Sequence, residues 1–72
     1  MQLDYQVEEA RVDGEVGYHF RVVGEGEGGA VVPLYSSADH IEELRISKAG
    51  YPNPHLARAV AQVVRKQLGT RN

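Results

Sequence analysis

The stretch NPHLARAVAQVVRKQLG, residues 53–69, carries the clearest structural signal in the chain. Asn53 suits the N-cap of a helix, because its side-chain oxygen can accept a hydrogen bond from a free N–H group of the first turn. Pro54 suits the first helical position, where a missing N–H costs nothing. Gly69 suits the end, since glycine readily adopts the left-handed conformation that closes a helix. We therefore predict an amphipathic helix on which a small sheet packs.

The predicted helix has an apolar face and a basic face. Apolar residues at spacings of three and four form the first, extended by two alanines: Leu56, Ala57, Val60, Ala61, Val63, Val64 and Leu68. The opposite face consists of Arg58, Gln62, Arg65 and Lys66. This basic face is either a solvated surface over a core helix or a surface that binds an anionic partner.

The length of the chain predicts one small α+β domain, 1–72. A domain of this size buries roughly 60% of the surface that its unfolded chain exposes, so it is marginally stable alone. The chain has no cysteine, which excludes disulfides and cysteine-based zinc sites. We therefore expect stabilisation by a second copy, as a homodimer.

The sequence predicts a cytoplasmic protein without a membrane partner. No apolar run approaches the roughly 18 residues that a membrane-spanning helix needs. The first residues, MQLDYQVEEA, contain acids and no basic region, unlike a signal peptide.

Charge is distributed unevenly along the chain. All ten acids precede position 44, where only two arginines accompany them, whereas the rest of the chain holds six cations and no acid. Such asymmetry is typical of a chain with a charged partner. It also fits an acidic sheet that attracts a basic helix, or two copies that pair head to tail.

Alternation of apolar and polar residues predicts three strands before the helix, at 2–12, 15–22 and 30–35. The pattern of the first strand shifts near Glu8 and Glu9, which predicts a β-bulge. Asp13 and Gly14 predict a type I′ hairpin turn, because both central positions of that turn need a positive φ. The second strand alternates most regularly, so we expect it at the centre of the sheet, packed on the helix.

The third strand, AVVPLY, is apolar on both faces. Pro33 has no N–H to donate, so this strand should lie at the sheet edge or end at a bulge. An open apolar edge promotes aggregation. We therefore expect a second copy to cover it, through a dimer contact made by Val31, Val32, Leu34 and Tyr35.

The segment between the sheet and the helix is predicted to contain a short helix. Asp39 and Glu42 have capping-box spacing, and apolar residues continue to a natural end near Gly50. The alternative is a fourth strand at 44–47. The predicted fold is therefore α+β: an antiparallel sheet of three or four strands, a short helix, and a C-terminal amphipathic helix packed on one sheet face.

The glycine-rich stretch GEGEGG matches the GxGxxG pattern of dinucleotide-binding loops. That pattern binds phosphate when it opens a helix. Here it leads into a strand, and Glu25 and Glu27 would repel phosphate. We interpret it as a hairpin loop and expect no nucleotide cofactor.

The other polar residues form no recognisable catalytic or metal site. His19, His40 and His55 lack the i,i+4 spacing of a helical metal site; His19 could meet Glu15 or Glu9 across the first hairpin. No evident catalytic partner accompanies the acid pairs Glu8–Glu9 and Glu42–Glu43 or the serines at 36 and 37. We therefore expect no catalytic, cofactor-binding or metal-binding residue, and no enzyme activity.

The segment FRVVGEGEG, followed by a helix with Arg58, Arg65 and Lys66, resembles the last part of a double-stranded-RNA-binding domain. The resemblance covers only this short piece and implies RNA contact through the last helix. Two features of that family are missing: the leading helix, and the lysine cluster at the start of the last helix, where this chain has Pro54, His55 and Leu56.

The function predicted from these patterns is a small non-catalytic protein-interaction module of bacterial or phage type that forms a homodimer. The first alternative is weak nucleic-acid binding through the basic face of the C-terminal helix, where clustered cations contact phosphates. The second is an acidic protein that imitates nucleic acid and inhibits a basic partner.

Overall fold

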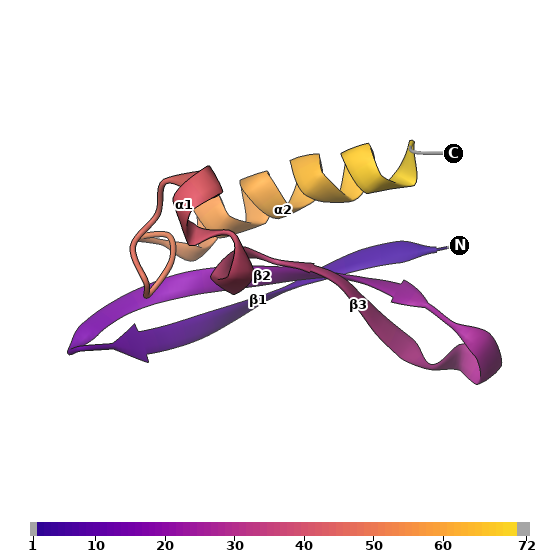
Figure 1. Ribbon diagram of the computed structural model, residues 1–72, viewed down its shortest axis with the longest axis horizontal. Helices are drawn as coiled ribbons and strands as arrows, with labels where there is room; N and C mark the ends of the chain where they lie inside the picture. Colours follow the sequence, from indigo (N-terminus) through magenta and orange to yellow (C-terminus); the bar gives the residue numbers. More distant parts are fainter. Residues whose placement is uncertain (1, 71–72) are drawn as a thin grey trace.

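The computed structural model describes residues 2–70 and has the predicted α+β architecture. Strands β1 (Leu3–Val12), β2 (Glu15–Glu25) and β3 (Val31–Ser36) form one antiparallel sheet in the order β1-β2-β3. Two 3-10 turns, η1 (Glu27–Gly29) and η2 (Ser37–Asp39), follow β2 and β3, and helices α1 (Ile41–Leu44) and α2 (Pro54–Gly69) complete the chain. Figure 1 shows α2 lying along one face of the sheet.

The hairpin between β1 and β2 turns at Asp13 and Gly14, whose φ values of 53° and 78° confirm the predicted turn. The β1–β2 pairing is continuous from Leu3↔Gly24 to Val12↔Glu15, so the predicted bulge near Glu8 and Glu9 is wrong. The apolar pattern shifts for another reason: the covered face changes along the strand.

Near the β1–β2 turn, the loop before α2 covers the face of the sheet that is opposite α2. At the start of β1 the half-buried side chains face α2, whereas nearer the turn Ala10 and Val12 are half-buried on the opposite face. There Ala10 pairs with Gly17, and a Cβ on Gly17 would collide with the backbone of Ala49. Ala49 is 1% exposed. The loop therefore passes round the edge of β2 and packs on the far face.

The core lies between β2 and α2. Phe20 and Val22 of β2 pack with Ala57 and Ala61 of α2, and all four are at most 1% exposed. The predicted central strand is therefore confirmed. The N-cap is also confirmed, since the Asn53 side chain accepts a hydrogen bond of 2.9 Å from the Leu56 N–H.

The apolar face of α2 is rotated from the predicted one. The small side chains of Ala57 and Ala61 form the line closest to the sheet, continued by half-buried Val64 and Leu68. Leu56 and Val63, which we assigned to the same face, lie on a flank and are 46% and 55% exposed. Alanine at the contact lets the helix approach the sheet closely. Because the helix packs through this line, Leu56 and Val63 stay outside the helix–sheet contact.

Strand β3 is an edge strand with a bulge, which confirms both expectations raised by Pro33. The register shifts after Val22↔Tyr35, so that Leu34 is the additional residue before Val23↔Pro33. The N–H of Gly26 donates to Ala30 at the hairpin. Since paired groups alternate along an antiparallel ladder, the ring nitrogen of Pro33 faces the open edge.

Helix α1 has a single turn. It ends at Leu44 and not near Gly50, because Arg45 takes a left-handed conformation with φ of 56°. Its N-cap is His40, which makes no side-chain capping bond, so the predicted capping box at Asp39 is wrong. The alternative fourth strand is absent from the described residues, where 44–47 contributes only an isolated bridge at Ser47.

The second edge of β2 is completed by three different segments. Strand β3 pairs with it from Arg21 to Glu25. At Phe20 the hydroxyl of Ser37 replaces a backbone partner: it accepts from the Phe20 N–H at 2.8 Å and lies 3.2 Å from the Phe20 carbonyl oxygen. At Tyr18 the N–H and carbonyl exchange hydrogen bonds of 2.9 and 2.8 Å with Tyr51. These bonds fix the loop that leads into α2.

Candidate interaction surfaces

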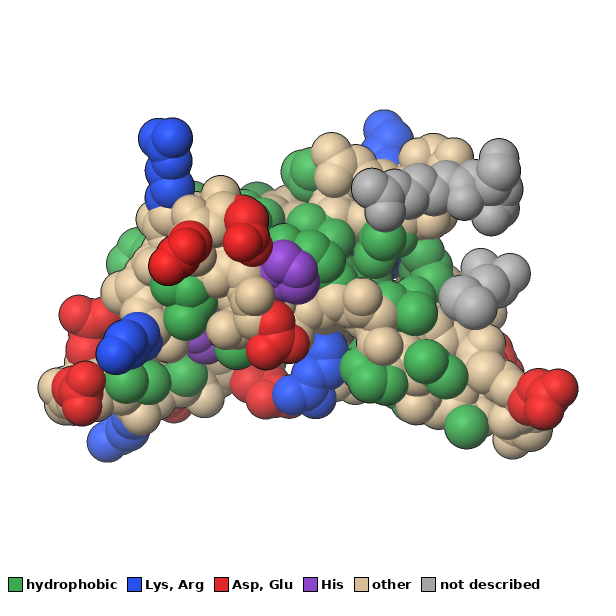
Figure 2. All heavy atoms as spheres, viewed as in Figure 1, with side chains coloured by type: hydrophobic (Ala, Val, Ile, Leu, Met, Phe, Trp, Pro, Cys, Tyr) green, Lys and Arg blue, Asp and Glu red, His purple; other side chains and the backbone are tan. Residues whose placement is uncertain are grey.

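Large apolar side chains are exposed on β3 and on the neighbouring flank of α2. We define the apolar surface as four of them, with exposed fractions of 38%, 39%, 46% and 55%: Val32, Leu34, Leu56 and Val63. Val31, which is 66% exposed, lies instead on the opposite face of the sheet, beside Val23 and Pro33. In Figure 2 hydrophobic side chains extend from beneath α2 to the outer part of β3. The sheet and helix thus leave apolar area in contact with water on this side of the molecule.

Tyr35, the fourth residue of the predicted dimer contact, belongs instead to the margin of the core. Its ring stacks on Phe20 at 5.7 Å and on His40 at 4.1 Å between centroids. Burial raises the pKa of Tyr35 above 10.0, and the charge of Glu43 raises it further. Burial likewise raises the pKa of Tyr51, with a smaller effect from Tyr35. Both phenols therefore stay neutral at physiological pH.

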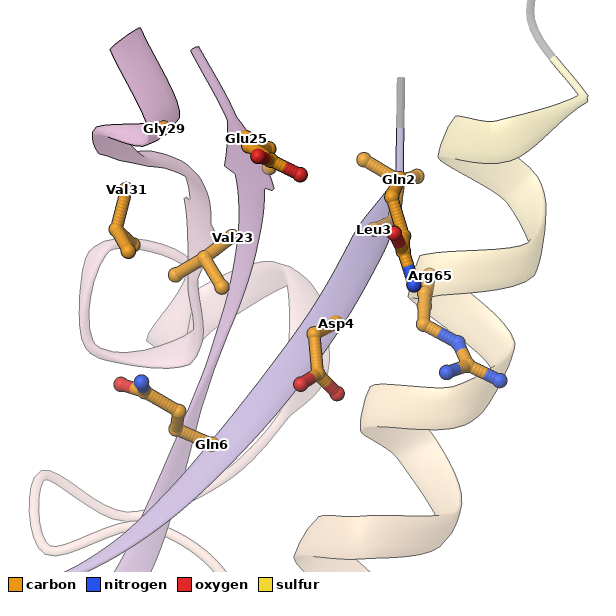
Figure 3. A pocket seen from close by; sticks show the side chains of 10 residues that line it. Gln2, Leu3, Asp4, Gln6, Val23, Glu25, Gly29, Val31 and Arg65 are labelled. Atoms are coloured by element: carbon orange, nitrogen blue, oxygen red, sulfur yellow. The ribbon is translucent and has the colours of Figure 1, made fainter.

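The residues of the predicted basic face of α2 are all exposed, and two of them, the neutral Gln62 and the basic Arg65, contact β1. The side-chain amide of Gln62 donates to the Tyr5 hydroxyl at 3.1 Å, and the guanidinium of Arg65 lies 5.7 Å from the Tyr5 ring centroid, a cation–π distance. Figure 3 shows Arg65 projecting from α2 alongside the first residues of β1. Arg58 and Lys66 have no such contact with the sheet within residues 2–70.

The expected attraction between an acidic sheet and a basic helix does not take the form of direct ion pairs. The ion pairs found within residues 2–70 join Arg11 to Glu9 at 3.7 Å and Arg21 to Glu8 at 3.5 Å, all within the sheet. The cations of α2 are therefore available to other molecules.

His19 contacts neither Glu15 nor Glu9, the partners suggested by the sequence. Its Nδ1 lies 2.7 Å from the Ser37 hydroxyl and its Nε2 lies 2.8 Å from the Lys48 carbonyl oxygen. Since a carbonyl oxygen only accepts, Nε2 must carry the proton when the ring is neutral, and Nδ1 then accepts from Ser37. Ser37 is completely buried, so its hydroxyl is a structural group that a substrate cannot reach.

The remaining candidates for a ligand site are the glycine-rich loop, one surface hollow, and the histidine and acidic side chains. The glycine-rich loop leads into β3, as predicted, and holds its turn with positive φ at Gly28 and Gly29. The hollow drawn in Figure 3 lies between the start of β1 and the β2–β3 hairpin, and is lined by exposed residues such as Asp4 and Glu25. No group of three histidine or acidic residues suited to a metal occurs within 2–70.

Comparisons with models of known protein families, with curated proteins and with solved structures return no match for this chain. In the part of the chain that the structure describes, no helix is both long enough and apolar enough to cross a membrane.

The exposed apolar flank of α2 is the surface feature that the sequence pattern did not reveal. A helical wheel centred on Ala57 and Ala61 would have placed Leu56 and Val63 outside the contact with the sheet. The signal was present, but larger apolar side chains are usually expected to lie closest to the core.

Proposed function

We propose that this protein is a small, non-catalytic protein-interaction module that works as a homodimer and binds another protein through the apolar surface. The observation that supports this is the balance between buried and exposed apolar groups. Three of the seven buried apolar residues within 2–70 are alanines, Ala49, Ala57 and Ala61, whereas the apolar surface consists of valines and leucines. Exposed apolar groups gathered on one side are typical of a contact site for another protein.

The partner contacts side chains and not the free backbone of β3. Pro33 removes a donor from the open edge, and the bulge at Leu34 interrupts the regular spacing that an added strand needs. Valine and leucine side chains on β3 and α2 instead offer a surface into which an amphipathic helix can pack.

Acidic side chains at the two ends of the apolar surface indicate which charges the partner carries. Glu43 lies near Tyr35 at one end, where it raises the pKa of that phenol. Glu25 and Glu27 are exposed on the hairpin at the other end. An amphipathic helix with an apolar centre and lysine or arginine at both ends complements this arrangement.

A synthetic peptide with a leucine face and lysines at both ends tests the surface. Titration followed by amide chemical shifts should perturb β3 and the α2 flank, and Leu34→Asp should weaken binding by about tenfold or more. Val16→Asp is the matched control, because Val16 is also apolar and 45% exposed but lies at the opposite end of β2. Equal losses in the two variants, or shifts spread over the whole sheet, would contradict the proposal.

Weak nucleic-acid binding is the second candidate, since the cations of α2 form no ion pair within residues 2–70. Binding at low salt should fall when Arg58→Glu and Lys66→Glu are introduced, and should weaken steeply as salt is added. An unchanged mobility of mixed DNA and RNA at low salt removes this candidate.

A further inference from the structure

Strand β1 has an open edge that is better suited to backbone pairing than that of β3. It runs for ten residues in unbroken register and, among residues 2–70, has a neighbouring strand on one side only. The N–H of Glu25 donates to the carbonyl of Gln2, which shows that even-numbered positions of β1 face β2. The odd-numbered residues therefore direct their backbone groups to the open edge: Leu3, Tyr5, Val7, Glu9 and Arg11.

One of these outward donors is already bonded. The N–H of Tyr5 donates to the carboxylate of the adjacent Asp4 at 2.8 Å, in an exposed position. An added strand offers a carbonyl in place of this local partner. Nothing comparable to Pro33 or to the bulge of β3 interrupts β1.

We propose that β1 pairs antiparallel with β1 of a second copy, about a twofold axis at Val7. This inference rests on the proposed homodimer and specifies its interface. Centred on Val7, the register places Tyr5 opposite Glu9 of the second copy and Leu3 opposite Arg11 of the second copy. Every outward-facing residue then has an outward-facing partner, as an antiparallel ladder requires.

Charge distinguishes this register from its neighbours. An axis at Glu8 would place two copies of Glu8 opposite each other, and an axis at Gln6 would place Asp4 opposite Glu8 of the second copy. Like charges directly opposite in a sheet are destabilising. With the axis at Val7, Gln6 faces Glu8 and Asp4 faces Ala10, so no like charges are opposed.

The same register brings the basic flank of α2 to an acid of the second copy. Arg65 lies over the Tyr5 ring, and Glu9 of the second copy is placed directly beside that tyrosine. The two ends of β1 also differ in how far α2 covers them. The last turn of α2 reaches Leu3, since a Cβ on Gly69 would lie 3.6 Å from its side chain, whereas Glu9 is exposed.

The resulting dimer has one continuous sheet with both α2 helices on the same face. The β3 strands are then the outermost strands, one at each end. Each apolar surface stays accessible, so the dimer can engage two partner segments at once, which raises the strength of binding to a partner that carries two such segments.

Charge reversal tests the interface by sedimentation velocity over a concentration series. Glu9→Arg and Arg65→Glu should each weaken dimerisation on the order of 10- to 100-fold, because two symmetric contacts change from attraction to repulsion. The double variant should recover most of the loss. Arg58→Glu is the matched control, since Arg58 is a cation of the same helix without a contact to Tyr5, and it should leave the dimer intact.

The outcomes separate this interface from the apolar surface. Circular dichroism identifies any variant that fails to fold. A wild-type chain that stays monomeric at millimolar concentration overturns the dimer, as does a double variant that is no more dimeric than the single ones. Peptide binding is measured on the same variants, and its persistence in a monomeric variant shows that the apolar surface works independently.

Discussion

Replacing Ser37 with alanine should destabilise the protein far more than its size suggests. The hydroxyl is completely buried and contacts three groups: the Phe20 N–H at 2.8 Å, the Phe20 carbonyl at 3.2 Å and His19 Nδ1 at 2.7 Å. On the edge of β2 away from β1, no strand among residues 2–70 lies beside Phe20, so the Phe20 N–H depends on this one side chain.

The magnitude follows from the groups left without a partner. One buried unsatisfied donor or acceptor costs about 1–3 kcal/mol, so leaving the Phe20 N–H and His19 Nδ1 without their Ser37 partner should cost about 3 kcal/mol. A domain of this length has a free energy of unfolding of about 4–11 kcal/mol. The variant should therefore lose a large share of its stability and melt about 12–24 °C lower.

Urea unfolding followed by circular dichroism measures the free energy of unfolding, at one protein concentration for all variants because a dimer is stabilised by mass action. The neighbouring Ser36 supplies the control. Its side chain makes no capping hydrogen bond, so Ser36→Ala should change stability by less than about 0.5 kcal/mol. Equal losses for the two serines would refute the role assigned to Ser37.

Three further predictions concern packing, ionisation and the start of α2. Gly17→Ala should cost about 1–3 kcal/mol in urea unfolding, because its Cβ would meet the backbone of Ala49. The raised pKa values of Tyr35 and Tyr51 favour the neutral phenols in the fold, so the free energy of unfolding should be constant up to about pH 10 and fall as the pH rises through the folded pKa values. Asn53→Ala should cost about 1 kcal/mol, measured by thermal melting, since its side chain caps α2.

Each of these has a result that contradicts it. A Gly17→Ala variant as stable as Gly69→Ala, where the added Cβ has room, would show that the loop can move aside. An alkaline loss of stability that is unchanged in the double variant Tyr35→Phe and Tyr51→Phe would show that these two phenols do not cause it. An unchanged melting temperature for Asn53→Ala would mean that water replaces the cap.

Some parts of the fold that depend on local chemistry were predictable from the sequence, whereas the capping box at Asp39 and the left-handed helix end at Gly69 were wrong, since α2 includes Gly69 and is capped by Thr70. Asn53 and Pro54 set the start of α2, and Asp13 and Gly14 set the first turn, because each preference arises within a few residues. Pro33 likewise indicated an edge strand.

The parts that depend on distant contacts were not predictable in the same way. The bulge inferred at Glu8 and Glu9 was wrong because alternation reports which face is covered, and here the loop carrying Ala49 covers the second face. The bonds from Tyr18 to Tyr51 and from Phe20 to Ser37 join segments far apart in the chain, which no periodicity reveals. The open edge of β1 emerged only once the order of the strands was known.

The three segments that complete the second edge of β2 have a consequence for how the chain folds. The bonds at Phe20 and Tyr18 close long loops, which costs entropy before any contact compensates for it. The β1–β2 hairpin can form early, but it has no second neighbour until Ser37 and Tyr51 arrive. Docking of α2 and completion of β2 are therefore coupled, and the domain should gain its stability in one cooperative step.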